Sequence, residues 1–596
     1  MNMKKSRRDF LAGSAAAVGA ATMVGVAGAA ETAKVPPKAA GTSAGGSPAS
    51  PDITLETLAE AEKLLAIQYT RPEHVQVLKT IGKQVDQVVR RHQMRPDYDL
   101  TPATVFDVRA TGATPPRKAQ FQRAPNRFRR LPSNTQDIAY APVSALSEWI
   151  RTGQITSLDL TKLYLDRLKR IGPKLECVIT LTEDLALAQA AAADAEIAAG
   201  KYRGPLHGIP WGAKDLLDTK GIATTWGAAP FRDRVPNRDA AVVRLLRKAG
   251  AVLVAKLTLG ALAYGDVWFG GKTRNPWNTE EGSSGSSAGP AAATAAGLVG
   301  FSIGSETLGS IVAPSMRCGA TGLRPTFGRV SRVGAMALAY SMDKLGPICR
   351  TVEDTALVLH AINGYDRGDP GSVRAPFAFD GNRMARGLRL GYAPKWFKGS
   401  RVTEADRFAL EMARTVGMEL VEIDLPDLPY DSLVLILFAE AAAAFEELTL
   451  SGRDDLLVRQ DPNAWPNSIR QARFISAVDY VQAQRLRRRV MAIMDEAFDG
   501  IDAMISPSSG PPLLVITNLT GHPSLTLRTG FLRRATRHGP GDDPGAGDDE
   551  NGLRKLATVP NGTTLWGRPF DEGTLCTIGM ALETELGLWN RRPPVG

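Results

Sequence analysis

The spacing of apolar residues changes along the chain and divides it into regions. From about residue 139 onward, stretches with a period near 3.6 residues alternate with short apolar runs. The stretch 157–171 (SLDLTKLYLDRLKRI) predicts a helix capped by Ser157, and 239–250 predicts another. The runs that predict buried strands are 251–257, 388–393, 417–423 and 501–507. This alternation favours one large α/β domain with helices on both faces of a sheet.

The region before residue 139 has a different pattern. Residues 53–95 carry apolar side chains at helical spacing, interrupted at Arg71-Pro72, and predict a pair of amphipathic helices. Residues 96–137 are rich in proline and arginine and show little periodicity. We therefore expect 53–138 to form a helical and extended N-terminal segment that packs on the main domain.

The first 52 residues are typical of an exported protein. Residues 1–29 have a basic start, an Ala/Gly/Val-rich middle and small residues at a cleavage site of the A-x-A type. Arg7 and Arg8, followed by Phe10-Leu11, resemble a twin-arginine signal, which directs folded proteins across the bacterial inner membrane. Residues 30–52 read as a disordered linker. We expect a periplasmic or otherwise exported protein with no stable membrane insertion after signal cleavage.

Charge and composition exclude several classes of function. The formal net charge is +10, of which the leader holds four basic residues against one acidic residue, so the rest carries +7 over a long chain. That surplus is too dilute for nucleic-acid binding. Four dispersed cysteines and six dispersed histidines show no metal-ligand spacing. We expect no metal, no cofactor and buried thiols.

Residues 282–310 (GSSGSSAGPAAATAAGLVGFSIGSETLGS) have the composition of a flexible linker. A linker, however, would not hold an apolar segment of helix length followed by a strand-like run and a second Gly/Ser cluster. The order predicts a Gly/Ser loop, a small-residue helix, a short strand and another Gly/Ser loop. Glycines in both loops would let backbone N–H groups converge on one point, with a serine from each loop nearby.

Four motifs in order resemble the amidase signature family. Ser286 and Ser310 are 24 residues apart, as are the two serines of the family's G-G-S-S-G-G-S and G-[ST]-D-T-G-G-S-I-R-x-P motifs. The other three segments, with their family patterns, are 207–215 (HGIPWGAKD; G-I-P-x-x-x-K-D), 319–326 (GATGLRPT; G-x-x-G-L-K-P-T) and 567–572 (GRPFDE; G-R-P-F-D-E). The resemblance covers 139–596 and implies a central mixed sheet, with 535–552 as a mobile Gly/Asp-rich loop.

The resemblance implies a Ser-Ser-Lys triad in which Ser310 is the nucleophile, Ser286 the bridging serine and Lys214 the base. The chemistry agrees, because a serine hydroxyl needs a base and a lysine can serve only when burial keeps it neutral. The backbone N–H groups of the turn that follows the strand are suited to an oxyanion hole; these belong to Thr307, Leu308, Gly309 and Ser310.

Several positions depart from the family pattern. The first loop also permits a register that uses Ser283-Ser284, but Ser286 allows a gap-free helix between the loops. Leu308 replaces a glycine and narrows the turn, Val312 replaces an arginine, and Glu306 replaces an aspartate. Asp215 and Asp343 are weaker candidates for orienting catalytic groups, and His522 is a weaker candidate for substrate binding.

The leading interpretation is an exported amidase that cleaves a small-molecule or peptide amide, and esters as well, through an acyl-serine intermediate. Two alternatives stay open. One is a glutaminase-type subunit of a tRNA-dependent amidotransferase, which shares the fold. The other is a non-catalytic binding protein on an amidase scaffold. A homodimer is compatible with each of these interpretations.

Overall fold

The computed structural model describes residues 52–595 apart from 94–97, 99, 126–127, 400–401, 509–511 and 540–553. The expected export signal (1–29), all but the last residue of the expected linker (30–52) and most of the expected loop (535–552) lie outside the described residues. Of that loop, the structure describes Ala535, which is the last residue of a strand, and residues 536–539, which follow it without regular secondary structure.

An eleven-stranded mixed sheet forms the centre of the molecule. Parallel pairing joins β14 to β13 to β15 and β9 to β3 to β4, and the other neighbours are antiparallel. The strand order is β14 (Glu419–Glu422), β13 (Arg389–Tyr392), β15 (Ala503–Pro507), β17 (Leu556–Gly567), β16 (Ser524–Ala535), β10 (Thr321–Arg324), β11 (Lys344–Cys349), β9 (Phe301–Glu306), β3 (Pro210–Lys214), β4 (Val252–Leu257) and β2 (Val178–Leu181).

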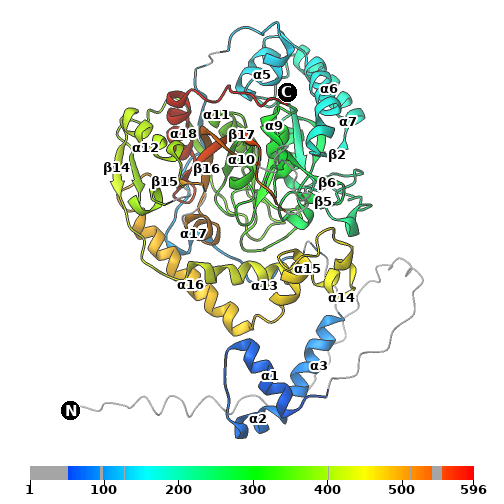
Figure 1. Ribbon diagram of the computed structural model, residues 1–596. Helices are drawn as coiled ribbons and strands as arrows, with labels where there is room; N and C mark the ends of the chain where they lie inside the picture. Colours follow the sequence, from blue (N-terminus) through cyan, green and yellow to red (C-terminus); the bar gives the residue numbers. More distant parts are fainter. Residues whose placement is uncertain are drawn as a thin grey trace, which may run out of the picture.

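Helices cover both faces of this sheet, as the sequence predicts. Successive side chains of a strand point to opposite faces, and those of β4 enter two different hydrophobic clusters. Leu253 packs in the cluster that contains α8 (Ala241–Lys248) and α11 (Val352–Ile362). Val252 and Val254 pack in the cluster of α6 (Ser157–Leu175), α7 (Glu183–Ala198) and α9 (Ala288–Ala295). Figure 1 shows α6 and α7 on the outer side of the sheet next to β2.

The N-cap of α6 differs from the predicted residue. The side chain of Thr156 accepts the bond from the Asp159 amide, so Thr156 and not Ser157 caps the helix. Ser157 is the first helical residue, and its buried hydroxyl donates to the carbonyl of Gly208 at 2.9 Å. That bond joins α6 to the turn that precedes β3.

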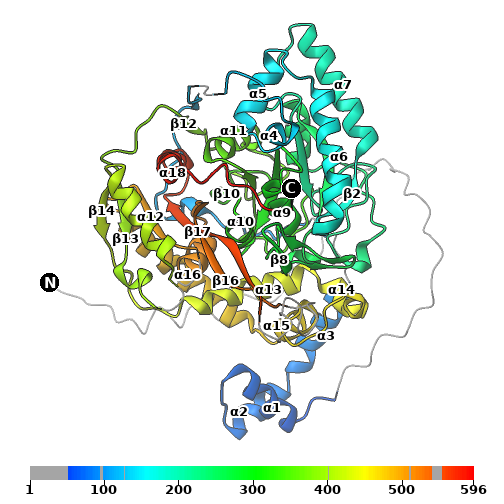
Figure 2. The same ribbon diagram turned by 45° about the horizontal axis from the view of Figure 1, so that its top comes forward.

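The described residues of 53–95 form three helices, not the predicted pair: α1 (Leu55–Leu65), α2 (Arg71–Leu78) and α3 (Ile81–His92). Pro72 lies in the first turn of α2, where its missing N–H costs nothing, so it begins a helix. Both ribbon views show α1 and α2 projecting away from the main body (Figures 1 and 2). The end of α3 reaches the body through Arg91, whose guanidinium donates to both carboxylate oxygens of Glu446 at 2.6 Å.

The described residues between 98 and 137 run along the main body, as expected of a wrapping segment. Strand β1 (Gln120–Gln122) pairs in parallel with β12 (Ala378–Asp380). The ring of Phe121 stacks on His360 at 4.1 Å between centroids, and the guanidinium of Arg487 lies 3.5 Å from the ring centroid of Phe106.

A layer of helices lies between the sheet and the projecting N-terminal helices (Figure 1). It consists of α13 (Val434–Ala444), α14 (Glu446–Leu450), α15 (Trp465–Ala472) and α16 (Ala477–Ala497). The helices α10 (Val312–Cys318), α12 (Glu404–Thr415), α17 (Leu513–Thr520) and α18 (Glu572–Leu586) pack closer to the strands.

Candidate active site

The Gly/Ser/Ala-rich stretch 282–310 is folded and buried. It follows the predicted order, with α9 after the first loop and β9 before the second. All eight residues of α9 are buried. A side chain at Gly289 would come within 2.5 Å of the backbone nitrogen of Thr258, so only glycine permits this close approach. The stretch therefore positions two loops rigidly next to each other.

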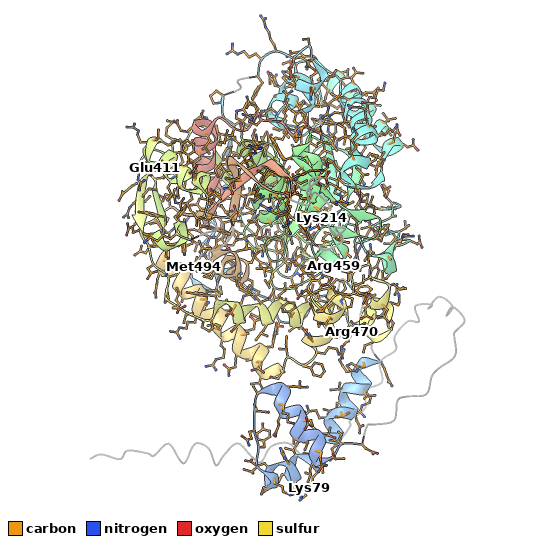
Figure 3. The ribbon with its side chains drawn as sticks, viewed as in Figure 1. Lys79, Lys214, Glu411, Arg459, Arg470 and Met494 are labelled. Carbon is orange, nitrogen blue, oxygen red and sulfur yellow. The ribbon has the colours of Figure 1, made fainter. Side chains whose placement is uncertain are left out.

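Lys214, the last residue of β3, is completely buried near the centre of the main body (Figure 3). The peptide bond between Gly285 and Ser286, in the loop that faces it, is cis. The Nζ atom of Lys214 lies 2.8 Å from the hydroxyl oxygens of both Ser286 and Ser305, and 3.1 Å from that of Ser287. The structure thus brings the predicted base and the predicted bridging serine into direct contact.

Ser287 constrains the direction of these hydrogen bonds. Its hydroxyl donates its only hydrogen to the backbone carbonyl of Ser305 at 3.0 Å, so its oxygen accepts from Lys214. A neutral lysine has two N–H donors and one lone pair. If one donor serves Ser287, the other donor and the lone pair remain for the hydroxyls of Ser286 and Ser305. The arrangement can accommodate a neutral lysine that accepts the proton of Ser286.

Burial lowers the pKa of Lys214 well below its usual value, because the charged ammonium loses its hydration. The carboxylates of Asp343 and Glu306 act in the opposite direction, but more weakly. No carboxylate forms an ion pair with Lys214 in the described part of the chain. The neutral form that a general base requires is therefore favoured.

Ser310 opens into a cavity of about 480 Å³, which Lys214 and Ser286 do not line. The side of the cavity nearest to Ser310 is formed by Ser284, Gly285, Thr307 and Leu308. The backbone N–H of Ser287 donates to the carbonyl of Ser310 at 3.1 Å, which ties the two serine loops together. A ligand in the cavity would therefore contact Ser310, whereas Ser286 and Lys214 lie outside the lining.

The turn 307–310 presents unpaired backbone donors. Within the described residues, the N–H groups of Leu308, Gly309 and Ser310 have no hydrogen-bond acceptor. Gly309 has φ +87°, a conformation that favours glycine and lets the chain reverse here. Because Leu308 and Ser310 line the cavity, these donors lie where an oxyanion could form.

Glu306 anchors the backbone that follows this turn. One carboxylate oxygen accepts from the amides of Ile311 and Val312 at 2.7 and 2.9 Å, and the other accepts from Arg324 at 2.6 Å. Burial alone would raise the pKa of Glu306. The Arg324 guanidinium, these amides and the Asn518 side chain outweigh burial and lower the pKa to about 2. Glu306 is therefore ionised at neutral pH and fixes the start of α10.

The two weaker acidic candidates have positioning contacts. Asp343 accepts from the Thr307 hydroxyl at 2.6 Å and so fixes one residue of the turn. Asp215 accepts from the amide and hydroxyl of Thr225 and forms a fully buried ion pair with Lys256 at 2.8 Å. These contacts anchor the loop after β3, and neither carboxylate contacts Lys214 directly.

The structure does not bring His522 to the cavity. Its ring stacks on Phe498, its Nδ1 lies 2.7 Å from the Thr520 hydroxyl, and its carbonyl accepts from Arg324. Burial, followed by the Arg324 charge, lowers the pKa of His522 to about 3. The residue packs in the core beside β16 and is absent from the lining of this cavity, so its role in substrate binding stays a prediction.

The sequence did not reveal the roles of Ser287, Ser305 and Arg324. The two serines complete the surroundings of Lys214, and Arg324 neutralises Glu306. The spacing of the serines identified Ser286, but nothing in a serine-rich segment distinguishes its other hydroxyls. Arg324 lies in the motif 319–326, which follows the second loop. That position was the feature of the sequence that could have indicated its contact with the loop.

The described residues contain no group of three or more histidine, cysteine, aspartate or glutamate side chains that could hold a metal ion. The four cysteines are buried free thiols. Among the described helices, none combines the length and apolar character needed to cross a bilayer.

Comparison with known proteins agrees with this geometry. The family profile described as Amidase matches residues 159–576. The chain is 31% identical to a glutamyl-tRNA(Gln) amidotransferase subunit from Carboxydothermus hydrogenoformans in an alignment of 491 positions that covers 77% of this chain and 99% of that protein. It is 29% identical to the solved peptide amidase of Stenotrophomonas maltophilia, with a TM-score of 0.63, over 76% of this chain and 98% of that one. The chain belongs to the amidase signature family, whose enzymes act on carbon–nitrogen bonds.

Proposed function

We propose that this protein hydrolyses a carboxamide through an acyl-serine intermediate at Ser310, and accepts esters by the same route. The observation that carries the proposal is the contact between the buried nitrogen of Lys214 and the hydroxyl of Ser286, in a loop that is bonded to the backbone of Ser310, which opens into a cavity. A neutral lysine, a bridging hydroxyl and an accessible hydroxyl are the three groups that such a relay needs.

In the proposed acylation step, Lys214 takes the proton of Ser286 while Ser286 takes the proton of Ser310. The Ser310 oxygen forms a bond to the amide carbonyl carbon. The carbonyl electron pair moves to its oxygen, which accepts from the free N–H groups of Leu308, Gly309 and Ser310. Removing one such donor costs roughly 3 to 4 kcal/mol in comparable sites.

Collapse of this intermediate breaks the carbon–nitrogen bond. The leaving nitrogen receives the proton from Ser286, which recovers one from the Lys214 ammonium. Water then enters, gives a proton to the same relay and attacks the acyl carbon. The carboxylic acid leaves and Ser310 regains its hydrogen. An ester follows the same sequence with an alcohol as the leaving group.

The test uses a fluorophosphonate probe and a chromogenic aryl amide with the purified mature protein. Wild type should be labelled at one serine and release the aryl amine. Ser310→Ala should lose both signals while its thermal unfolding stays close to that of wild type. Labelling of Ser310→Ala at full stoichiometry would place the nucleophile at another residue.

We further propose that the protein works outside the cytoplasm, as the twin arginine and the cleavage-site pattern of residues 1–29 indicate. The support is sequence pattern alone.

The relatives favour one second candidate, a component of an amidotransferase. Two proteins named as glutamyl-tRNA(Gln) amidotransferase subunits are 31% and 34% identical to this chain, the second from a Roseiflexus species. Residues 1–158 lie before the segment that matches the family profile, and this long N-terminal extension favours a stand-alone enzyme. Hydrolysis of aryl amides by the isolated chain would support the amidase. Release of ammonia from glutamine only after the addition of amidotransferase partner proteins would support the second candidate.

A further inference from the structure

The cavity at Ser310 has two chemically different walls. Tyr264, Val434, Leu437, Phe438 and Trp465 form an apolar wall, supplied mainly by α13 and α15. The other wall is basic and includes Lys272, Arg317 and Arg537. Asp266 is the acidic residue among the described lining residues. Three basic residues therefore line the space where the proposed substrate binds.

Arg317 is placed in the cavity by the geometry of α10. It lies in the last turn of the helix, seven residues after Ser310, which precedes the helix, and both residues line the cavity. Its side chain is about one-fifth exposed, and its Nη1 atom is 3.9 Å from the carboxylate of Glu281. This ion pair is at the limit of contact and leaves most of the guanidinium available.

Glu281 also positions Arg537. It lies on β8 (Asn278–Gly282), is almost fully buried, and accepts from the Arg537 backbone N–H at 3.1 Å. Its other oxygen accepts from Asn275 at 2.9 Å. The carboxylate thus orients the backbone of one arginine and the guanidinium of another, but it does not line the cavity itself.

Several buried guanidinium nitrogens have no acceptor among the described residues. They include Nε of Arg317, Nη1 of Arg537, and Nε and Nη2 of Arg534, which lies behind them on β16. A buried donor without an acceptor is costly, and native structures rarely leave one unexplained. Burial, and then the neighbouring Arg317 charge, lowers the pKa of Arg534 to about 10. The positive charges of Arg317 and Arg534 therefore lie close enough to affect each other.

Asp266 interacts with this wall and also holds the loop of Ser286. Its carboxylate accepts from the Ser284 amide at 2.9 Å. Burial raises the pKa of Asp266, while the charges of Lys272 and Arg317 lower it. Among the described residues, the carboxylates of Asp266 and Glu281 lie in or next to this wall, together with the basic residues Lys272, Arg317, Arg534 and Arg537.

We propose that the wall of Arg317 and Arg537 binds a carboxylate group carried by the amide substrate, so the enzyme prefers acidic amides. The proposal rests on the proposed function and names its substrate class. A carboxylate accepts from a guanidinium in a bidentate manner, and Arg317 and Arg537 both line the cavity. The apolar wall would hold the hydrocarbon part of the same molecule. Arg317 and Arg537 are specificity-determining residues and take no part in bond breaking.

The first test compares acidic amides with neutral analogues of similar size on the wild-type protein. N-Succinyl-4-nitroaniline is paired with N-valeryl-4-nitroaniline, which places the charge on the acyl side. 3-Acetamidobenzoate is paired with N-(3-isopropylphenyl)acetamide, which places it on the amine side. In at least one pair, kcat/KM should be about tenfold or more higher for the acid, as expected for a charge-assisted hydrogen bond. Equal values in both pairs, or preference for the neutral compounds, would overturn the proposal.

The second test uses variants. Arg317→Gln and Arg537→Gln should each lower the ratio of acid to neutral kcat/KM about 10- to 100-fold, mainly through KM. Arg533→Gln removes the same charge from an exposed position on β16 and should leave both rates unchanged. If the ratio of acid to neutral kcat/KM stays unchanged in both Arg317→Gln and Arg537→Gln, the assignment is contradicted, whatever the total activity.

Protection of Ser310 against fluorophosphonate labelling gives a readout without turnover. The acidic member of the preferred pair should protect at lower concentration than its neutral partner, and Arg317→Gln should abolish the difference. If the wild type is labelled but both compounds protect equally, the carboxylate site is wrong and the proposed function stands. If the wild type is neither labelled nor active, the proposed function itself fails.

Discussion

Lys214 Nζ lies 2.8 Å from the hydroxyl oxygen of Ser286, and neither residue lines the cavity into which Ser310 opens. Lys214, on the inner strand β3, is therefore more deeply buried than Ser310. Burial lowers the pKa of the lysine and favours its uncharged form, and in the proposed triad Ser286 would relay its basicity towards the cavity. This arrangement separates the requirement for a dry base from the requirement for an accessible nucleophile.

The first prediction concerns Lys214 and pH. Because burial lowers its pKa below the ordinary value of about 10.4, kcat/KM should rise with pH as the free enzyme loses this proton, then level off below that value. Lys214→Arg keeps a cation but cannot release its proton, so it should lose about 10²- to 10⁴-fold in kcat, as should Lys214→Ala. Substantial activity in Lys214→Arg, at unchanged thermal stability, would exclude the Ser-Ser-Lys mechanism.

The second prediction separates neighbouring serines in one loop. Ser286→Ala should reduce kcat by several orders of magnitude, because it breaks the proton relay. Ser283 is equally buried, but its hydroxyl donates to the backbone carbonyl of Ser284 and does not contact Lys214. Ser283→Ala should therefore keep most of the activity and serves as the matched control. If Ser283→Ala were the more damaged variant, the register of this loop would be displaced by three residues.

The pattern of the chain predicted the architecture well where period and spacing carry the information. The strands at 251–257, 388–393, 417–423 and 501–507 form within a residue or two of the expected positions, because short apolar runs between helices have few alternatives. The boundary at Ser157 was wrong by one residue. Thr156 and Ser157 both suit an N-cap, and tertiary bonds that the sequence does not show hold Ser157 in the helix: its hydroxyl donates to Gly208 and its amide donates to Asp194.

Within the candidate site, the sequence predicted those residues that lie in recognisable motifs. The 24-residue spacing predicted the pair Ser286 and Ser310, and sequence order alone could not show that Ser305 on β9 also contacts Lys214. Nor could it show that the carbonyl of His522 accepts from Arg324 while its ring packs in the core. Contacts across the sheet depend on register, which single-sequence patterns do not specify.

The third prediction tests the export proposal with conservative changes. Arg7→Lys combined with Arg8→Lys keeps the charge of the leader but removes the twin arginine, so the precursor should accumulate in the cytoplasm. Lys4→Arg with Lys5→Arg leaves the pair intact and should be exported normally. Cell fractionation and the size of the product report both. Normal export of the Arg7/Arg8 variant would indicate the general secretory route.

The last prediction concerns Glu306, which the structure connects to both the nucleophile turn and Arg324. Glu306→Gln replaces one carboxylate oxygen by an N–H₂ group that faces donors, and leaves the buried Arg324 charge unpaired. Breaking a buried ion pair in this way costs about 3 to 5 kcal/mol, so the variant should unfold at a clearly lower temperature. Its kcat should also fall, because the amides of Ile311 and Val312 lose their anchor. Glu280→Gln, on the exposed part of β8, is the matched control and should change neither property.

The contribution of Glu306 to the free energy of unfolding depends on pH. The folded-state pKa of Glu306 is about 2, below the ordinary value of 4.5, so the unfolded chain binds the proton more tightly. The stabilisation from Glu306 is fully present above pH 4.5 and is lost as pH falls towards 2. The difference in unfolding temperature between wild type and Glu306→Gln should therefore be constant near neutral pH and shrink in acid. A difference that stays the same down to pH 3 would mean that Glu306 acts through packing and not through its charge.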